Sequence, residues 1–169
     1  MVILIAGCSH TGKTALAQKL LETYRFPYMS IDHLKMGLIR SGYTNLQPED
    51  DQALTSYLWP IVREIVKTVI ENRQNLIVEG CYIPFGWERD FADNYLTQIR
   101  YYCLIMTEDY IRRKTDDILK YADVVEQRVD SSVDTEALVR ENLENLKACK
   151  AHGYPYILMD KAYHADIQL

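Results

Sequence analysis

The sequence lacks the features that would mark a disulfide-rich, membrane or nucleic-acid-binding protein. Its 4 cysteines, at positions 8, 81, 103 and 149, show no CxxC spacing, so they indicate neither a zinc cage nor a redox dithiol. Its 19 Lys and Arg residues are outnumbered by 24 Asp and Glu residues, which argues against a large nucleic-acid footprint. The apolar run at residues 1–6 is far shorter than the roughly twenty residues that span a bilayer. We therefore expect a reduced, cytoplasmic protein with no nucleic-acid or membrane partner.

The chain also has no internal repeat, no low-complexity stretch and no obvious interdomain linker. A length of 169 residues suits one domain with one hydrophobic core. We therefore expect residues 1–169 to form a single domain. The sequence leaves its oligomeric state open.

Short apolar runs alternate with stretches of helical periodicity along the whole chain. Such runs fit strands that are covered on both faces, and their alternation with helices predicts a three-layer α/β fold with a doubly wound parallel sheet. Pro60 is expected to kink or divide one helix, Asp32 and Asp134 to cap two others, and Gly153 to end the last. The expected strands are 2–6, 28–31, 75–79, 100–106 and 156–159, and the expected helices are 14–24, 32–40, 54–72, 89–96, 108–121 and 134–153.

A glycine-rich segment between the first strand and the first helix carries the clearest functional signal. It matches the G-x-x-x-x-G-K-[ST] pattern of a phosphate-binding loop in its required strand–helix context. Its glycines let successive backbone N–H groups point at phosphate oxygens, beside the positive end of the helix. Lys13 would reach the β- and γ-phosphates, and the hydroxyl of Thr14 would hold Mg²⁺. The predicted nucleotide-binding residues are Gly7, Cys8, Ser9, His10, Thr11, Gly12, Lys13, Thr14 and Ala15.

Two alternatives remain open for this segment. It could be a glycine-rich turn with a surface lysine that matches the pattern by chance. Such chance matches are rare when a strand precedes the pattern and a helix follows it. His10 could act as a catalytic base or simply occupy a variable position of the loop.

Two carboxylates are expected at the edge of the sheet where ligands gather. Asp32 follows the second strand and Glu79 ends the third, and in open parallel sheets ligands bind at the carboxyl ends of the strands. Asp32 could orient or deprotonate an acceptor hydroxyl, and Glu79 could bind Mg²⁺ through water. Alternatively, Asp32 is a plain helix cap and Glu79 a salt-bridged strand end.

These motifs together resemble the small-molecule and nucleotide kinases of the phosphate-loop class, which are built like adenylate kinase and shikimate kinase. Besides the loop, the segment 31–34 (IDHL) is similar to the acidic position after the second strand in these kinases. The segment 76–80 (LIVEG), followed by Pro84, resembles their apolar strand that ends in an acid and a glycine. The resemblance implies an ATP-dependent phosphotransferase that uses Mg²⁺ and a small-molecule acceptor.

Finer features of the resemblance concern the acceptor and the lid. The segment 32–40 also resembles 2-phosphoglycerate-kinase-like proteins. In contrast, Glu79 stands where adenylate kinases usually have Asp, and no arginine directly follows Pro84. The resemblance places an arginine-bearing lid at residues 108–134. Its candidate arginines are Arg112, Arg113 and Arg128, and Arg113 is the predicted catalytic one. Alternatively, each could lie on a solvated surface, and Arg113 could form an ordinary (i, i+4) pair with Asp117.

The residues expected to bind the acceptor surround the two carboxylates. Lys35 and Arg40 could bind an anionic acceptor or lie on a solvated helix face. Tyr82 and Trp87, placed just beyond Glu79, could line the pocket or pack in the core. The predicted acceptor-binding residues are Asp32, Lys35, Arg40, Gly80 and Tyr82.

The sequence therefore favours a kinase that transfers the γ-phosphoryl group of ATP to a small hydroxyl- or phosphate-bearing metabolite. Lys13, Asp32 and Arg113 are the catalytic candidates, with Thr14 and Glu79 at the metal. The alternatives are a nucleoside monophosphate kinase, a kinase for a nucleotide-sugar or an antibiotic, and a non-catalytic ATP-binding regulatory protein. A switch GTPase is disfavoured because no NKxD-type segment is present.

Overall fold

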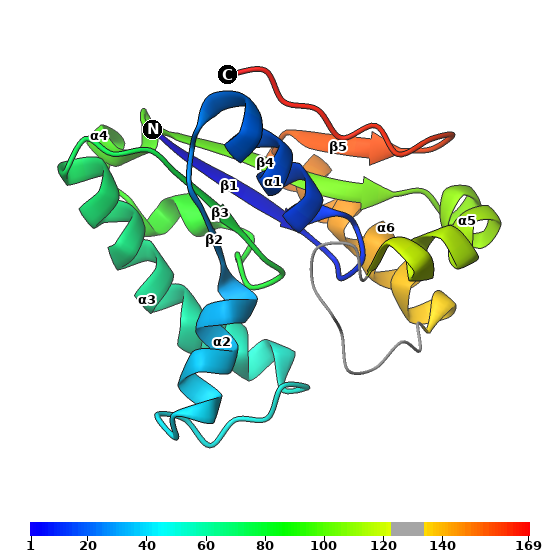
Figure 1. The fold of residues 1–169 in the computed structure, drawn as a ribbon, viewed down its shortest axis with the longest axis horizontal. Helices are drawn as coiled ribbons and strands as arrows, with labels where there is room; N and C mark the ends of the chain where they lie inside the picture. The colour runs from blue at the N-terminus through cyan, green and yellow to red at the C-terminus, as the bar shows by residue number, and fades with distance from the viewer. Residues whose placement is uncertain (123–133) are drawn as a thin grey trace.

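The protein is built on a five-stranded parallel sheet (Figure 1), and its computed structural model describes residues 1–122 and 134–169. The strand order β2-β3-β1-β4-β5 places β1 at the centre, paired in parallel with β3 and β4. The predicted doubly wound α/β fold is confirmed. The strands are β1 (Val2–Gly7), β2 (Tyr28–Ser30), β3 (Leu76–Glu79), β4 (Ile99–Met106) and β5 (Tyr156–Met159). The helices are α1 (Lys13–Tyr24), α2 (Ile31–Arg40), α3 (Asp51–Glu71), the 3₁₀ turn η1 (Trp87–Asp90), α4 (Asp93–Leu96), α5 (Glu108–Ala122) and α6 (Thr135–His152).

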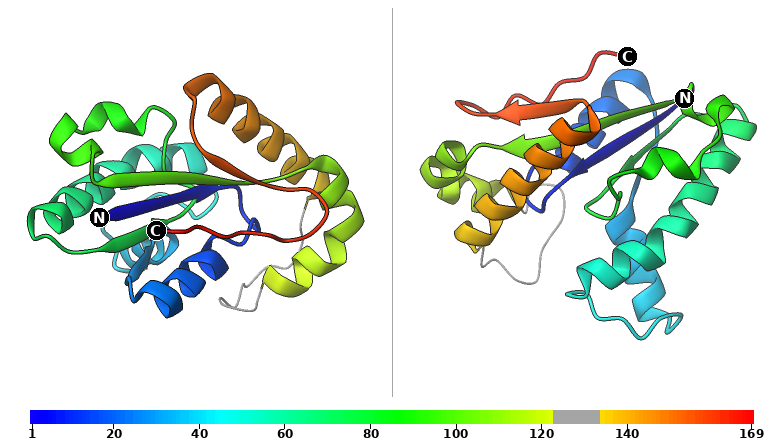
Figure 2. Two further views of the ribbon diagram at one scale, coloured as in Figure 1. Left: turned by 90° about the horizontal axis from the view of Figure 1, so that it is seen from above. Right: turned by 180° about the vertical axis from the view of Figure 1, so that it is seen from behind.

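Two hydrophobic clusters cover the two faces of the sheet. Val2 and Leu4 of β1 point into the cluster with α3, whereas Ile3 and Ile5 point into the cluster with α1. This alternation is the two-residue period of a strand. Figure 2 shows α3 and α6 on one face and α1 on the other. The continuous apolar run at the start of the chain is thus explained by burial on both faces.

The helix α3 continues through Pro60, where the sequence predicted a kink or a division. It runs without interruption from Asp51 to Glu71 with Pro60 inside it. Proline removes the hydrogen bond to the carbonyl four residues earlier, which belongs to Ser56. Both Ser56 and Pro60 are exposed, so water can satisfy that carbonyl, while the buried Leu54, Leu58 and Val62 hold the opposite side of the helix against the sheet.

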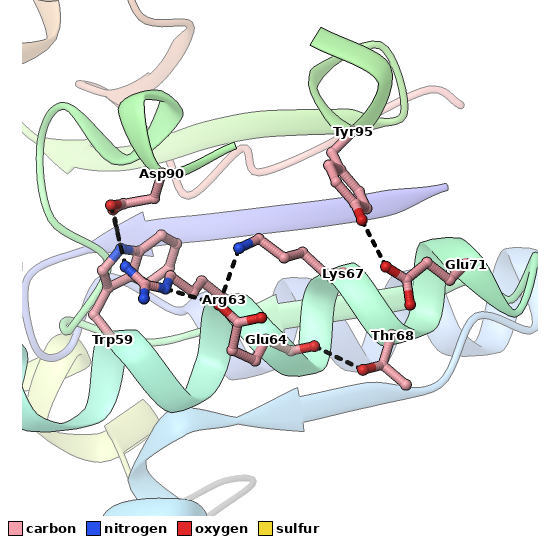
Figure 3. Close-up of polar contacts among 8 residues, drawn as sticks. All are labelled: Trp59, Arg63, Glu64, Lys67, Thr68, Glu71, Asp90 and Tyr95. Carbon is pink, nitrogen blue, oxygen red and sulfur yellow. Dashed lines mark hydrogen bonds and ion pairs between the residues drawn. The ribbon is translucent and has the colours of Figure 1, made fainter. Parts of the chain in front are cut away.

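The single helix expected at residues 89–96 is instead two short turns, η1 and α4. Side chains of α3 hold both turns (Figure 3): Trp59 Nε1 donates to Asp90 Oδ2 at 2.7 Å, and Tyr95 Oη donates to Glu71 Oε1 at 2.6 Å. These contacts with α3 thus hold η1 and α4 as separate turns, and the periodicity of the sequence does not predict the break between them.

The predicted ends of α6 are confirmed, whereas the predicted cap of α2 is not. Asp134 caps α6 as predicted, because its side chain accepts from the N–H groups of Glu136 and Ala137, and Gly153 ends that helix with φ 68°. The predicted Asp32 cap is wrong: α2 begins at Ile31, and Ser30 occupies the cap position. Asp32 therefore lies within the first turn of α2, beside the carboxyl end of β2.

Within residues 1–122 and 134–169, no helix combines the length and apolar character needed to cross a membrane.

Candidate functional site

The loop between β1 and α1 has the backbone that its two glycines allow. Gly7 has φ 142° and Gly12 has φ 80°, both in the region that favours glycine. A Cβ atom on Gly7 would lie 2.6 Å from the Leu104 carbonyl oxygen, and one on Gly12 would collide with the Tyr163 ring. Both glycines are therefore required by conformation and by close approach.

Polar contacts inside the loop hold its lysine in place. Lys13 Nζ donates to the Cys8 carbonyl at 2.7 Å, and Thr11 Oγ1 donates to the same carbonyl at 2.9 Å. From α6, Asn145 Nδ2 donates to Cys8 Sγ at 3.0 Å. Lys13 is buried and Thr11 wholly so. The loop is thus preorganised around the lysine.

The surroundings of Lys13 favour its charged form. Burial alone would lower the pKa of Lys13, but Cys81, Glu79 and Asp32 raise it above its usual value. A buried cation with acidic neighbours is a stable positive charge at neutral pH. The structure therefore brings the predicted Asp32 and Glu79 close to Lys13, at the carboxyl edge of the sheet.

Two side chains whose oxygens could bind a metal lie together at the predicted metal position. Thr14 Oγ1 donates to Glu79 Oε1 at 3.2 Å, and Glu79 is only 1% exposed. Hydroxyl and carboxylate oxygens are the ligands that Mg²⁺ prefers. The described residues contain no group of three or more His, Cys, Asp or Glu that could hold a metal. A pair of oxygens still fits Mg²⁺, since in phosphoryl-transfer sites the metal keeps waters and binds substrate phosphates.

A second group of side chains joins α2, α3 and the segment after β3. Lys35 Nζ lies 2.9 Å from Asp32 Oδ1 and donates to Tyr82 Oη at 2.9 Å. Tyr82 Oη in turn donates to Asp51 Oδ1 at 3.1 Å, and Tyr82 is only 3% exposed. We call Asp32, Lys35, Tyr82 and Asp51 the α2–α3 cluster. Three of its members were predicted to bind the acceptor.

Other predicted residues lie apart from this cluster or serve packing. Arg40 is exposed at the last residue of α2, eight residues and so about 12 Å along the helix from Asp32. Gly80 permits a close approach, because a Cβ there would lie 2.9 Å from Ile31 Cβ. Trp87 is buried and stacks on Tyr101 at a centroid distance of 5.8 Å, so it packs in the core.

The candidate lid arginines pair with acidic residues of α5 and α6 and with the segment after β5. Arg113 Nη2 lies 2.6 Å from Asp109 Oδ2 and donates to the Asp160 carbonyl at 3.1 Å. Arg112 pairs with Glu108 and Glu136. Of the predicted lid, residues 123–133, and with them Arg128, lie outside the described part of the chain.

The remaining loop residues are more accessible. Ser9 and Ala15 are exposed and His10 is half-buried with φ 64°. The left-handed backbone at His10 is uncommon for a residue with a side chain.

Sequence reasoning missed three residues that contact the loop or the α2–α3 cluster. Cys81 is exposed, and its Sγ lies 3.4 Å from Lys13 Nζ. Asp51 is the first residue of α3 and joins the α2–α3 cluster. Tyr163 Oη donates to the Gly12 carbonyl at 2.9 Å. Each comes from a segment without a recognisable motif, although the position of Cys81 directly after Glu79-Gly80 was a usable signal.

The sheet order and the loop define the fold of the P-loop small-molecule kinases. Comparisons with solved structures support this fold. A protein from Chloroflexus aurantiacus, described only provisionally as a kinase, has a TM-score of 0.56 at 21% identity, over 94% of this chain and 86% of that one. Shikimate kinase from Acinetobacter baumannii has a TM-score of 0.56 at 16% identity, over 96% and 85%. A sugar kinase from Janibacter sp. has a TM-score of 0.50 at 15% identity, over 94% and 84%.

No protein-family profile matches the chain, and no curated protein matches it in sequence. At these identities the similarity shows the fold.

Proposed function

We propose that this protein is an ATP-dependent kinase that transfers the γ-phosphoryl group, with Mg²⁺, to a small hydroxyl- or phosphate-bearing metabolite. One observation carries the proposal: Lys13, the Thr14–Glu79 pair and Asp32 meet at the carboxyl edge of the sheet. Phosphoryl transfer needs mainly positioning and neutralisation of charge, and this set of side chains supplies both.

Each residue has a distinct task in this proposal. The backbone N–H groups of residues 7–14 and the charged Lys13 bind the phosphates of ATP. Thr14 and Glu79 would hold Mg²⁺, which when bound neutralises charge on the β- and γ-phosphates. Asp32, half-exposed and paired with Lys35, orients the acceptor hydroxyl and takes up its proton.

The acceptor would bind at the α2–α3 cluster. Lys35 and Tyr82 belong to this cluster, whereas Arg40 and Gly80 lie outside it. The ion pair between Arg113 and Asp109 would have to break before the Arg113 guanidinium could reach a phosphate.

The test is ADP release from Mg-ATP across a panel of hydroxylated and phosphorylated metabolites and nucleoside monophosphates. We expect one chemical class of acceptor to stimulate release. Stimulation by nucleoside monophosphates alone would assign a nucleotide kinase. Binding of Mg-ATP without stimulation by any acceptor would favour the non-catalytic regulatory protein.

A further inference from the structure

A serine hydroxyl at the end of β2 is buried without a hydrogen bond. Ser30 is 1% exposed, and its Oγ has no partner among residues 1–122 and 134–169. In that part of the chain, only one other buried side-chain nitrogen or oxygen, Trp87 Nε1, lacks a partner. Buried polar groups are nearly always paired, because an unpaired group loses its hydration without compensation. The position of Ser30 must therefore explain this exception.

The usual local role of a serine at this position does not explain it. Ser30 occupies the cap position of α2, where a serine side chain commonly accepts from a backbone N–H group of the first turn. The Ser30 side chain makes no such bond. The hydroxyl therefore contributes no cap to α2.

The strand register places Ser30 beside Glu79 on the face of the sheet that α1 covers. Along the parallel strands β2 and β3, Tyr28 pairs with Ile77 and Ser30 pairs with Glu79. Tyr28 and Ile77 pack in the hydrophobic cluster with α1, and residues two positions further along a strand face the same side. Neighbouring strands lie about 4.8 Å apart. The side chains of Ser30 and Glu79 are therefore adjacent in one row across the sheet.

Glu79 is the carboxylate that the proposed function places at the metal. Its Oε1 accepts from Thr14 Oγ1 at 3.2 Å. Carboxylates at metal sites are themselves fixed by hydrogen bonds from neighbouring groups, and loss of such a group weakens metal binding. A serine hydroxyl can turn toward a neighbouring carboxylate by rotation of its side chain alone. Neither β2 nor β3 would have to move.

We infer that Ser30 is a positioning residue of the metal site, and that its hydroxyl donates to the Glu79 carboxylate when Mg²⁺ and nucleotide are bound. This inference rests on the proposed kinase function. The carboxylate would then be held from two sides, by Thr14 of α1 and by Ser30 of β2. A hydroxyl with this task gives up the cap of α2 and lies in the row of Glu79.

The test is calorimetric titration with a non-hydrolysable ATP analogue, with Mg²⁺ and with EDTA, so that affinity is read without turnover. We expect Ser30→Ala to bind the analogue about tenfold more weakly than the wild type with Mg²⁺, and equally well with EDTA. The matched control is Ser41→Ala, which removes an exposed hydroxyl at the other end of α2. It should change neither affinity.

Two further measurements separate positioning of Glu79 from support of the fold. In thermal unfolding without nucleotide, Ser30→Ala should melt at the wild-type temperature or higher, because the deleted hydroxyl has no hydrogen bond to lose. In a Glu79→Gln background, Ser30→Ala should weaken binding with Mg²⁺ by less than about twofold more, since Ser30 acts through the carboxylate that is already gone.

The outcomes separate the role of Ser30 from the kinase assignment. Wild-type affinity of Ser30→Ala with Mg²⁺, equal losses with Mg²⁺ and with EDTA, a lower melting temperature, or additive losses in the double variant would each overturn the role of Ser30. In each of these cases, binding of the analogue by the wild type leaves the kinase assignment standing. Absence of any binding by the wild type would overturn the proposed kinase and the role of Ser30 with it.

Discussion

Thr14 Oγ1 and Glu79 Oε1 lie 3.2 Å apart and join the start of α1 to the end of β3. The pairing of Ile5 with Glu79 in the parallel sheet fixes this distance, because β1 leads directly into the loop that ends at Thr14. The register of the central strands thus determines where a metal could be held.

We expect Glu79→Gln to raise the Mg²⁺ concentration needed for half-maximal ADP release about tenfold. The substitution keeps the shape and the hydrogen-bond acceptor for Thr14 but removes the charge that would attract the metal. Mg²⁺ titration of the rate checks this result. The control is Glu71→Gln at the last residue of α3, where the amide oxygen can still accept from Tyr95, and it should leave the Mg²⁺ dependence unchanged. An unaltered dependence in Glu79→Gln would remove Glu79 from the metal site.

Asp32→Asn should lower turnover about a hundredfold, since it removes the proposed general base. Affinity for Mg-ATP should change little, because Asp32 lies in α2 and not in the phosphate loop. Steady-state kinetics and nucleotide titration separate the two effects. Asp166→Asn, which affects a surface pair with Lys19, is the control, and equal losses of turnover and affinity in Asp32→Asn would assign Asp32 to the nucleotide.

Iodoacetamide at pH 8 should modify one thiol per chain, at Cys81. Cys81 is exposed, whereas Cys8, Cys103 and Cys149 are buried, and burial with the nearby Glu141 raises the pKa of Cys8 to about 12. Because thiolates are the reactive species, Cys8 stays protonated and unreactive at this pH. Mass spectrometry gives the stoichiometry and the site.

Mg-ATP should slow this modification, because Cys81 Sγ lies 3.4 Å from Lys13 Nζ. Cys81→Ser provides the unlabelled control. Equal rates with and without Mg-ATP would show that the nucleotide does not occupy the space at Lys13.

Tyr163→Phe should weaken Mg-ATP binding about fivefold through loss of one hydrogen bond, to the Gly12 carbonyl. Tyr163→Ala should weaken it further, because the ring that packs on Gly12 is then also lost. Calorimetric titration with Mg-ATP measures both. If both variants bind as tightly as the wild type, the C-terminal segment has no part in shaping the loop.

The parts of the site that the sequence revealed are those encoded locally. Residues 7–14 are consecutive, so their spacing alone indicates a phosphate loop, and the acid that ends β3 follows an unmistakable apolar run. The cap at Asp134 and the end at Gly153 are equally local, since each depends on hydrogen bonds within one turn.

Features that depend on distant contacts could not be found in this way. Asp51 and Tyr163 come from segments with no motif, and only the folded chain brings Asp51 to Tyr82 and Tyr163 to the Gly12 carbonyl. The break between η1 and α4 and the continuity of α3 at Pro60 likewise depend on tertiary packing, which overrides local propensity.

The most direct test of the proposed function is transfer of isotopically labelled γ-phosphoryl from ATP to an acceptor by the wild type and by Lys13→Ala. Lys13→Arg serves as a second variant that keeps the charge, and thermal unfolding verifies folding. We expect label in the acceptor with the wild type and a loss of about a thousandfold in Lys13→Ala, because the charge that steadies the β- and γ-phosphates is gone. Transfer at the wild-type rate by folded Lys13→Ala, or no transfer by the wild type to any acceptor, would contradict the assignment of this protein as a kinase.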